Sequence, residues 1–533
     1  MRRGFGAGRA TRCALVLAAI LAAGPVQAHG FGERYDLPVP LWLYLTGAGL
    51  AVTASFVVMA LFMRAALLPR TSPRINLLAS AIARVAAEYI VFPVLRATTL
   101  VLYILVISAG LFGNQSPLKN IAPIMIWAIW WVGMAYASAL IGNLWLIVNP
   151  LTTLFAWAER LYRRVRGRRE LSRGLRYPDG LGVWPAVALF FAFTWMELVW
   201  GDSDSPAHVG AAVLAYSVVT WLGMYAFGMR EWLRRGEVFS LVFGLLSRFA
   251  PTELRVCEAS PRRDDASQPQ GKSMPPDGSA PGALCWELRP YAVGLLAEEP
   301  LHVSHIVLVL FMLAAVSFDG FLETPAWVAI ADGMGTWRLP ASGANAVPLQ
   351  PDGNSRALAS SLGLMVAPGL FFLAFYCVCG LIARFGNADW PARDQPQRRN
   401  AVMRTAGLFV LTLIPIAIAY HLAHYLSFLA SAMQYMVPIA SDPFGFGWDL
   451  FGGARYFVRF GVVDTTIIWY TSVTAIVAGH IAAVFLGHAL ALREFPDRRA
   501  ALRSQYPMLG LMVGYTMLSL WIIAQPIVSS RFG

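Results

Sequence analysis

The sequence has little charge for its length. Only 14% of its 533 residues are Asp, Glu, Lys or Arg, whereas 57% are hydrophobic. A soluble protein of this size needs far more charge on its surface, so the composition excludes that class. The expected fold class is all-α, a polytopic helix bundle integral to a lipid bilayer.

Lysine is almost absent, since Lys119 and Lys272 are the only two. Lysine and arginine together still outnumber the acidic residues by 42 to 30, which gives a net charge of +12. The arginines fall in alternate loops between apolar stretches, as they do when positive charge marks the cytoplasmic side of a membrane. The basic charge therefore indicates topology, and we expect no nucleic-acid partner.

Cysteine is scarce as well, with five in the chain. Cys257 and Cys285 fall in an expected cytoplasmic segment, and Cys377 and Cys379 fall within an expected helix. Because disulfides form mainly in oxidising compartments, we expect none in this fold.

Long apolar stretches are abundant. About ten of them approach or exceed the twenty residues that a helix needs to cross a bilayer. The arginine-rich loops predict a bacterial inner membrane protein with both mature ends on the periplasmic side. The expected spans are residues 40–62, 97–113, 121–148, 181–200, 209–227, 302–319, 358–382, 405–428, 466–490 and 509–527.

Composition divides the chain into a leader, two halves and a linker. A basic start, a short apolar core and Val26-Gln27-Ala28 predict a cleaved signal peptide, with an uncleaved signal anchor as the alternative. Residues 258–282 are rich in Pro, Gly, Ser, Asp and Arg and are expected to be disordered. Residues 238–249 are apolar with charged ends and are expected to lie on the inner membrane surface. The expected divisions are 1–28 (signal peptide), 29–250 (N-terminal half, about five helices), 251–300 (cytoplasmic linker) and 301–533 (C-terminal half, about five helices).

Histidines within the apolar stretches carry the strongest functional signal, because an ionisable side chain in a bilayer is costly unless it has a partner or a task. His421 and His424 are three residues apart, so on a helix they share a face and can reach one ligand. Histidine with carboxylate suits a divalent or transition metal ion, namely zinc, copper, iron or manganese. The alternative is two histidines hydrogen-bonded to neighbouring helices. The expected metal ligands are His29, His208, His421 and His424, and the expected catalytic acids are Glu197, Asp319 and Asp464.

The other histidines are weaker candidates. Cleavage of the signal would leave His29 at the N-terminus, where its amine and imidazole together can bind one metal ion. His302 and His305 share a helical face, whereas His480 and His488 lie about 12 Å apart along the helix axis. These four could line a proton or ion path or bind haem, and His302 and His488 could equally be interfacial residues. We keep His302, His305 and His480 as secondary candidates.

The segment after the expected cleavage site resembles a known family. Residues 28–44 read Ala-His-Gly-Phe-Gly-Glu-Arg-Tyr-Asp-Leu-Pro-Val-Pro-Leu-Trp-Leu-Tyr and lead directly into the first apolar stretch. This opening, which covers less than a tenth of the chain, resembles bacterial membrane proteins known as fenitrothion hydrolases. The resemblance carries over no site residues. It implies hydrolysis of a neutral, lipophilic organophosphate triester with release of a nitrophenol.

Such a substrate partitions into the bilayer, and its hydrolysis needs an activated water and a Lewis acid at phosphorus. The four expected metal ligands, with Asp319 or Glu197 orienting the water, would meet that need.

Two other function classes fit the same residues. The histidines and acids could handle protons or a metal ion in a transporter or channel, which suits two helical halves joined by a linker. The chain could also be the haem- or quinone-binding subunit of a redox complex, with additional membrane subunits as partners. A transporter would depend on an ion gradient and would release no reaction product. A redox subunit would show a visible absorption band when purified.

Overall fold

The computed structural model describes residues 39–63, 72–167, 170–256, 284–296, 299–335, 353–386, 395–459 and 464–525. Within these residues, ten helices are long and apolar enough to cross a membrane, which confirms the expected all-α polytopic bundle. Helices are the expected form because every backbone polar group in lipid must be satisfied within the chain. The expected signal peptide, His29 and residues 258–282 lie outside the described residues.

The elements of the N-terminal half include two π-helices, η2 and η4, which interrupt membrane spans. In chain order, the elements are α2 (Leu41–Phe62), β1 (Ile75–Asn76), α3 (Ala81–Ala86), η2 (Ala87–Val91), α4 (Phe92–Phe112), η3 (Pro117–Lys119), α5 (Ile121–Ile124), η4 (Met125–Gly133), α6 (Met134–Leu140), α7 (Trp145–Val148), α8 (Pro150–Arg166), η5 (Asp179–Leu181), α9 (Trp184–Leu198), α10 (Pro206–Phe227), α11 (Met229–Arg235) and α12 (Val238–Ser247).

The remaining elements begin with two strands and continue with longer helices. They are β2 (Thr252–Val256), β3 (Leu284–Leu288), η6 (Val293–Leu295), α13 (Val303–Leu322), α14 (Pro325–Gly335), α15 (Gly353–Gly386), α16 (Gln395–Phe409), η7 (Val410–Leu413), α17 (Ile414–Ser441), α18 (Thr465–Glu494) and α19 (Arg498–Ile523).

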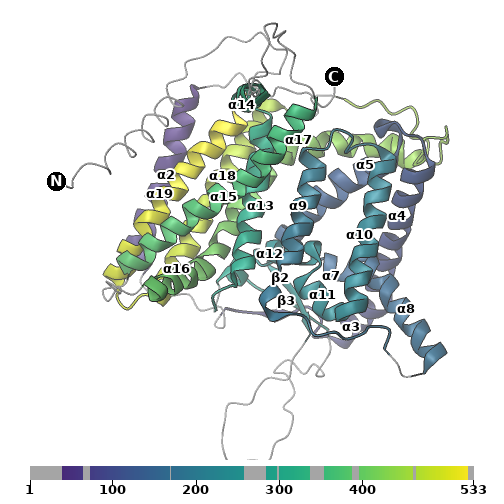
Figure 1. Ribbon diagram of the computed structural model, residues 1–533, viewed down its shortest axis with the longest axis horizontal. Coiled ribbons are helices and arrows are strands. Elements are labelled where there is room, and N and C mark those ends of the chain that lie inside the picture. Colours follow the sequence, from purple (N-terminus) through teal and green to yellow (C-terminus); the bar gives the residue numbers. More distant parts are fainter. Residues whose placement is uncertain are drawn as a thin grey trace, which may run out of the picture.

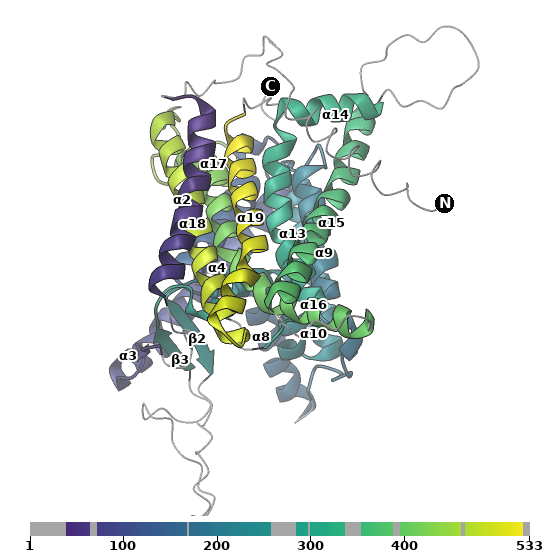
Figure 2. The same cartoon turned by 90° about the vertical axis from the view of Figure 1, so that its left-hand side faces the viewer.

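Figures 1 and 2 show the long helices running between two ends of the bundle. We call the end that carries β2 and β3 the sheet end, and the opposite end, near α14, the loop end. The most enclosed spans are Val303–Leu322, 78% buried, and Asn400–Ser441, 83% buried, whereas Leu41–Phe62 is only 22% buried. α13 and α17 therefore form the centre of the molecule, and α2 lies at its periphery.

The two halves of the chain are joined by more than the linker. α17 packs against α13 and α18 of its own half, and also against α5 and η4 of the N-terminal half. α17, the central helix of the C-terminal half, therefore forms part of the interface between the two halves.

The short helix α12 does not lie on the membrane surface as expected. Its residues Val238, Phe239, Val242 and Phe243 are buried, and it packs against α6, α7, α9 and α17. Glu237, itself fully buried, accepts hydrogen bonds from the first backbone N–H groups of the helix. An apolar segment with charged ends has the same sequence pattern in both positions, so the pattern could not distinguish a surface helix from one inserted into the bundle.

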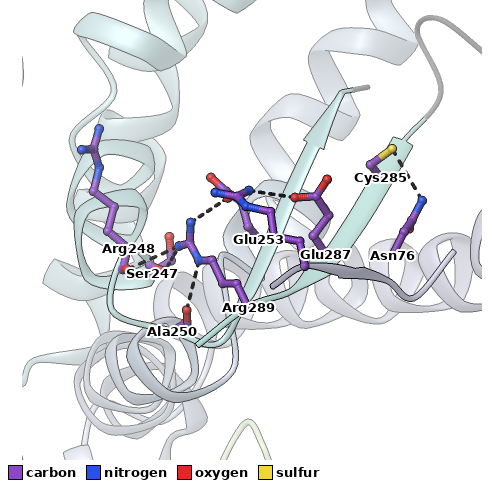
Figure 3. A network of polar contacts seen from close by, with 9 residues as sticks. Asn76, Ser247, Arg248, Ala250, Glu253, Cys285, Glu287 and Arg289 are labelled. Carbon is purple, nitrogen blue, oxygen red and sulfur yellow. Dashed lines mark hydrogen bonds and ion pairs between the residues drawn. The ribbon is translucent and has the colours of Figure 1, made fainter. Parts of the chain in front are cut away.

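A three-stranded antiparallel sheet at the sheet end was not predicted. β3 lies between β1 and β2, so the ends of the expected linker are ordered against the segment that follows the first span. Arg74 lies 3.0 Å from Glu253 and 2.8 Å from Glu287. Arg289 lies 2.6 Å from Glu253 (Figure 3). Alternating opposite charges therefore tie the strands together.

Arg289 connects this network to α12. Its side chain is only 4% exposed, and its guanidinium donates to the backbone oxygens of Ser247, Arg248 and Ala250 at the end of that helix (Figure 3). Cations are favourable at helix C-termini, where carbonyl groups lack intrahelical partners. Burial lowers the pKa of Arg289 from its ordinary value, and the charge of Glu253 opposes that shift.

The expectation that the fold contains no disulfide is wrong, because Cys285 in β3 is disulfide-bonded. Its partner lies outside the described residues. Cys377 and Cys379 are free thiols on α15.

Candidate active site

A small cavity lies in the centre of the bundle, where helices from both halves of the chain meet. η4, α6, α9 and α12 form one wall, and α13 and α17 form the other. The cavity volume is about 40 Å³. Because a buried water needs about 10–15 Å³, this space admits about three waters. Most of the lining is apolar, and its polar or aromatic polar members are Trp131, Tyr136, Thr194, Glu197, Asp319, His421 and Tyr425.

Asp319 is the most enclosed acid of the cavity, with a side chain 8% exposed. Its Oδ2 lies 2.9 Å from His424 Nε2 and 2.6 Å from the Tyr425 hydroxyl. The same hydroxyl lies 3.3 Å from Oε1 of Glu197. A buried carboxylate is stable only when it is paired and hydrogen-bonded. The contacts with His424 and Tyr425 therefore stabilise the buried carboxylate of Asp319. The structure thus brings together Asp319, Glu197 and His424, three of the candidate residues named from the sequence.

His421 lines the cavity one helical turn before Tyr425. Both of its ring nitrogens are buried and have no hydrogen-bond partner among the described residues. The rings of Trp131, Tyr136 and Tyr425 surround it at centroid distances of 5.9, 5.4 and 4.7 Å. Because a neutral imidazole has one basic nitrogen, His421 offers an unoccupied base to the cavity.

Trp131 supplies a matching donor. Its indole Nε1–H is buried and has no hydrogen-bond partner among the described residues. Buried polar groups are normally satisfied, so an unbonded base and an unbonded donor in one cavity indicate a site for a polar ligand or water.

The helices that carry these residues depart from α-geometry beside the cavity. Trp131 lies in η4, a π-helix of nine residues. On the other wall, the 3₁₀-helix η7 leads into α17, whose second residue is Pro415. π-helical segments are rare and occur frequently at functional sites, and Pro415 lacks the N–H that would continue the helix before it.

Gly320 allows α17 to pack closely against α13. A Cβ at this position would lie 2.7 Å from the Tyr420 hydroxyl and 3.4 Å from His424 Nδ1. The first distance is too short for a Cβ contact, so a larger residue would displace Tyr420 and disturb the Asp319–His424 pair.

Two predicted site residues lie elsewhere. His208 stacks on Trp200 at a centroid distance of 4.7 Å, and its Nδ1 lies 3.3 Å from the Asp202 carbonyl oxygen. Asp464 caps α18 by accepting a hydrogen bond from the Thr466 N–H at 2.7 Å. Neither appears among the described residues that line the cavity. Aromatic stacking and helix capping explain both positions.

The secondary histidines are also separate from the cavity lining. His302 caps α13, where its Nδ1 accepts a hydrogen bond from the Ser304 N–H at 3.3 Å. His305 lies one turn further on, and its buried Nδ1 has no partner among the described residues. His480 is 1% exposed, and its Nδ1 lies 2.8 Å from the Ile476 carbonyl oxygen.

The predicted metal ligands do not converge. Within the part of the chain that the structure describes, no group of three or more His, Cys, Asp or Glu side chains is arranged to hold a metal ion. His424 already uses Nε2 to contact Asp319, and His29 lies outside the described residues. The donors that are described therefore do not fit a metal centre.

Three aromatic residues of the site, Trp131, Tyr136 and Tyr425, are absent from the residues predicted from sequence. Tyr425 had a usable signal, since it lies four residues after His421 and so shares its helical face. The other two belong to a chain with 18 Trp and 18 Tyr, and nothing in their spacing separates them from aromatics that face lipid.

No protein-family model, curated protein or solved structure matches this chain. Its function must therefore be argued from the geometry of the cavity and from the resemblance at residues 28–44.

Proposed function

We propose that the cavity is the active site of a membrane-embedded hydrolase in which His421 acts as general base. The observation that supports this most is an unbonded, buried imidazole beside a space for about three waters. A general base must lie within hydrogen-bond reach of the water that it deprotonates, and a ring lining a water-sized cavity meets that condition. Asp319 or Glu197 accepts the other hydrogen bond of the same water and so orients it.

The proposed substrate class is a lipophilic phosphotriester, which follows from the resemblance at residues 28–44. His421 takes one proton of the water while the water oxygen bonds to phosphorus. The bond from phosphorus to the aryl oxygen breaks, and the nitrophenolate leaves without needing a proton. Trp131 donates its indole N–H to the phosphoryl oxygen or sulfur, where negative charge develops.

Substrate entry requires the walls to separate, because a phosphotriester is far larger than three waters. The apolar lining, which includes Met312, Val242 and Ile418, suits a substrate that arrives from the bilayer. Met312 is unbranched and adapts readily to a new neighbour.

The test is release of nitrophenol from fenitrothion by liposomes that contain only this chain. We expect release that persists in EDTA and falls by about 10²–10⁴-fold in His421→Ala, the range for loss of a general base. His208→Ala is the matched control and should release nitrophenol at the wild-type rate. Wild-type release by His421→Ala would contradict the role of the base, and loss of release in EDTA would favour a metal ion.

A proton-coupled transporter is the second candidate, and one observation favours it. The cavity lies between the two halves, and residues Val242 and Leu246 of the ten-residue α12 form part of its wall. Transport sites commonly lie between halves, beside helices that end within the membrane. In the same liposomes, a pH gradient that drives solute uptake without nitrophenol release would support this alternative.

We also propose that the membrane is the bacterial inner membrane and that the sheet end faces the cytoplasm. Many arginines flank the spans at that end, as the positive-inside rule requires. The disulfide of Cys285 alone favours the opposite orientation. Arginines in several loops act together on the topology, so they outweigh a single disulfide and place the sheet end in the cytoplasm in this proposal. A green fluorescent protein fused after residue 533 should stay dark and an alkaline phosphatase should be active there; the reverse result would invert the topology.

A further inference from the structure

Buried polar groups continue from the Asp319–His424 pair into the interior of the C-terminal half, away from the cavity. The Tyr420 hydroxyl and His424 Nδ1 both border Gly320, at the distances given above. Tyr420 is 1% exposed, and its hydroxyl has no hydrogen-bond partner among the described residues. Because His424 donates through Nε2 to Asp319, its neutral form leaves Nδ1 as an acceptor beside Gly320, where the Tyr420 hydroxyl also lies.

A pair of hydroxyl groups lies one turn closer to the sheet end, on the same face of α13 as Gly320. Ser317 Oγ is hydrogen-bonded to the Tyr515 hydroxyl of α19. The Tyr515 ring lies 5.8 Å, between centroids, from the ring of His480 on α18. Since the Nδ1 of His480 is bonded to a carbonyl oxygen, that nitrogen carries the proton. The Nε2 of His480 is therefore a basic nitrogen, buried and unbonded among the described residues.

The same helix carries His488 nearer the sheet end. It is fully buried, and its Nδ1 lies 2.9 Å from Oε1 of Gln505. Gln505 and Gly487 line a second cavity of about 10 Å³, which has room for about one water. His480 and His488 are about 12 Å apart along the helix axis, so a proton moving between them needs intervening water.

We propose that these groups form a proton relay between the sheet end and the cavity. Each hydroxyl accepts one proton while giving up its own. His424 takes a proton from Tyr420 at Nδ1 as it passes its Nε2 proton to Asp319, and the reverse transfer returns it. His480 takes and returns a proton at Nε2, because its Nδ1 proton is held by the Ile476 carbonyl oxygen, and the intervening water connects that nitrogen with His488. One proton therefore moves and no group is consumed. The inference rests on the proposed function only in taking the cavity as the place where a proton is released. The members, in order, are His424, Tyr420, Ser317, Tyr515, His480 and His488.

A purely structural explanation accounts for part of this arrangement. Hydroxyl pairs hold membrane helices together, and the hydrogen bond of Ser317 to Tyr515 needs no other role. It does not account for the unbonded hydroxyl of Tyr420 on one side of that pair and the unbonded Nε2 of His480 on the other.

The test measures proton entry into liposomes that contain the purified full chain and an internal pH-sensitive dye. A potassium gradient with valinomycin supplies the driving potential. We expect wild-type protein to admit protons faster than protein-free liposomes do, and His480→Gln and Tyr515→Phe to reduce entry to the protein-free level. His208→Gln, a histidine outside the relay, is the matched control and should keep the wild-type rate.

Tyr515→Phe removes a single oxygen and so preserves folding if His480→Gln does not. Wild-type entry equal to that of protein-free liposomes, or wild-type entry by both variants, overturns the relay. Nitrophenol release is recorded in the same samples. Release without proton entry would refute the relay alone, whereas relay-dependent proton entry without release would refute the hydrolase and leave the relay standing.

Discussion

Two buried ionic clusters, one at the sheet end and one beside the cavity, satisfy their charges in different ways. At the sheet end, Arg289 and Arg74 contact the carboxylates of Glu253 and Glu287. Two cations face two anions, and the remaining donors of Arg289 bond to carbonyl oxygens that end α12. This cluster is balanced and holds strands and helix together.

The cluster beside the cavity is not balanced in this way. Asp319 and Glu197 are two acids that share one tyrosine hydroxyl, and His424 is the one ionisable base bonded to them in the hydrogen bonds described above. His421 lies next to them, and neither of its ring nitrogens has a hydrogen-bond partner in the part of the chain that the structure describes. The difference is that opposite charges match one another at the sheet end, whereas the cluster beside the cavity includes His421, an imidazole that has no hydrogen-bond partner among the described residues.

The largest effect on stability should come from breaking the balanced cluster. Arg289→Met leaves Glu253 with only the half-exposed Arg74 and removes the cap of α12, so we expect a loss on the order of 3–5 kcal/mol. Thermal unfolding in detergent measures it. The matched variant Arg74→Met removes a cation that is 30% exposed and should cost clearly less. Equal losses from both variants would refute the special role of Arg289.

At the cavity, we expect the opposite: a large loss of activity and a small loss of stability. Asp319→Asn keeps a hydrogen-bond acceptor for Tyr425 but removes the charge that pairs with His424. We expect nitrophenol release to fall about 100-fold, which corresponds to about 2.7 kcal/mol in activation free energy. The unfolding temperature should change little. An unfolding temperature lowered as far as that of Arg289→Met would mean that this cluster, too, is mainly structural.

A substitution that adds a single methyl group sharpens the comparison. Gly320→Ala forces a Cβ against Tyr420 and His424, so we expect a destabilisation of about 1–3 kcal/mol, the usual cost of overpacking, together with reduced activity. Gly514→Ala on α19 is the matched control, since its Cβ would meet open space. It should be neutral or slightly stabilising because alanine favours helix. A neutral Gly320→Ala would show that α13 and α17 can shift apart freely.

The smallest effect concerns a carboxylate that is neither buried nor ion-paired. Hydrogen bonds from the Ser441 hydroxyl and the Ala454 N–H hold the pKa of Asp449 below its ordinary value of 3.8. Because the folded pKa is the lower one, the unfolded loop binds protons first as the solution is acidified. The stabilisation is therefore present above pH 3.8 and is lost as the pH falls through the depressed pKa.

Fluorescence of Trp448, which lies in the same loop, should report this acid transition. Asp449→Asn should remove its pH dependence without affecting nitrophenol release. A transition that persists unchanged in this variant would assign it to another group.

The sequence was sufficient to predict the spans and part of the site. A helix that crosses lipid needs a long apolar stretch, and this requirement is local, so the ten spans could be read directly. The cost of burying charge pointed to Asp319, Glu197 and His424 among a larger set of candidates, in which His424 was expected to bind a metal and the two acids to be catalytic.

What could not be predicted depends on contacts between distant segments. The sheet pairs Ile75 with Leu288, and β1 has only two residues, which is too short for a recognisable strand pattern. The insertion of α12 depends on Arg289, which is far from it in sequence. The sequence could not show that Asp464 caps a helix and that His208 stacks on Trp200, away from the cavity lining, because both roles depend on the folded position of each residue.

The position of Tyr425 between two acids has a consequence for its one proton. A phenol has a single proton, so Asp319 and Glu197 compete for the same donor. The hydroxyl lies 2.6 Å from Asp319 and 3.3 Å from Glu197, so it favours Asp319. Because α9 carries Glu197 and α13 carries Asp319, a shift between these helices would change which acid accepts that proton, so opening the site and redirecting its hydrogen bond would be one event.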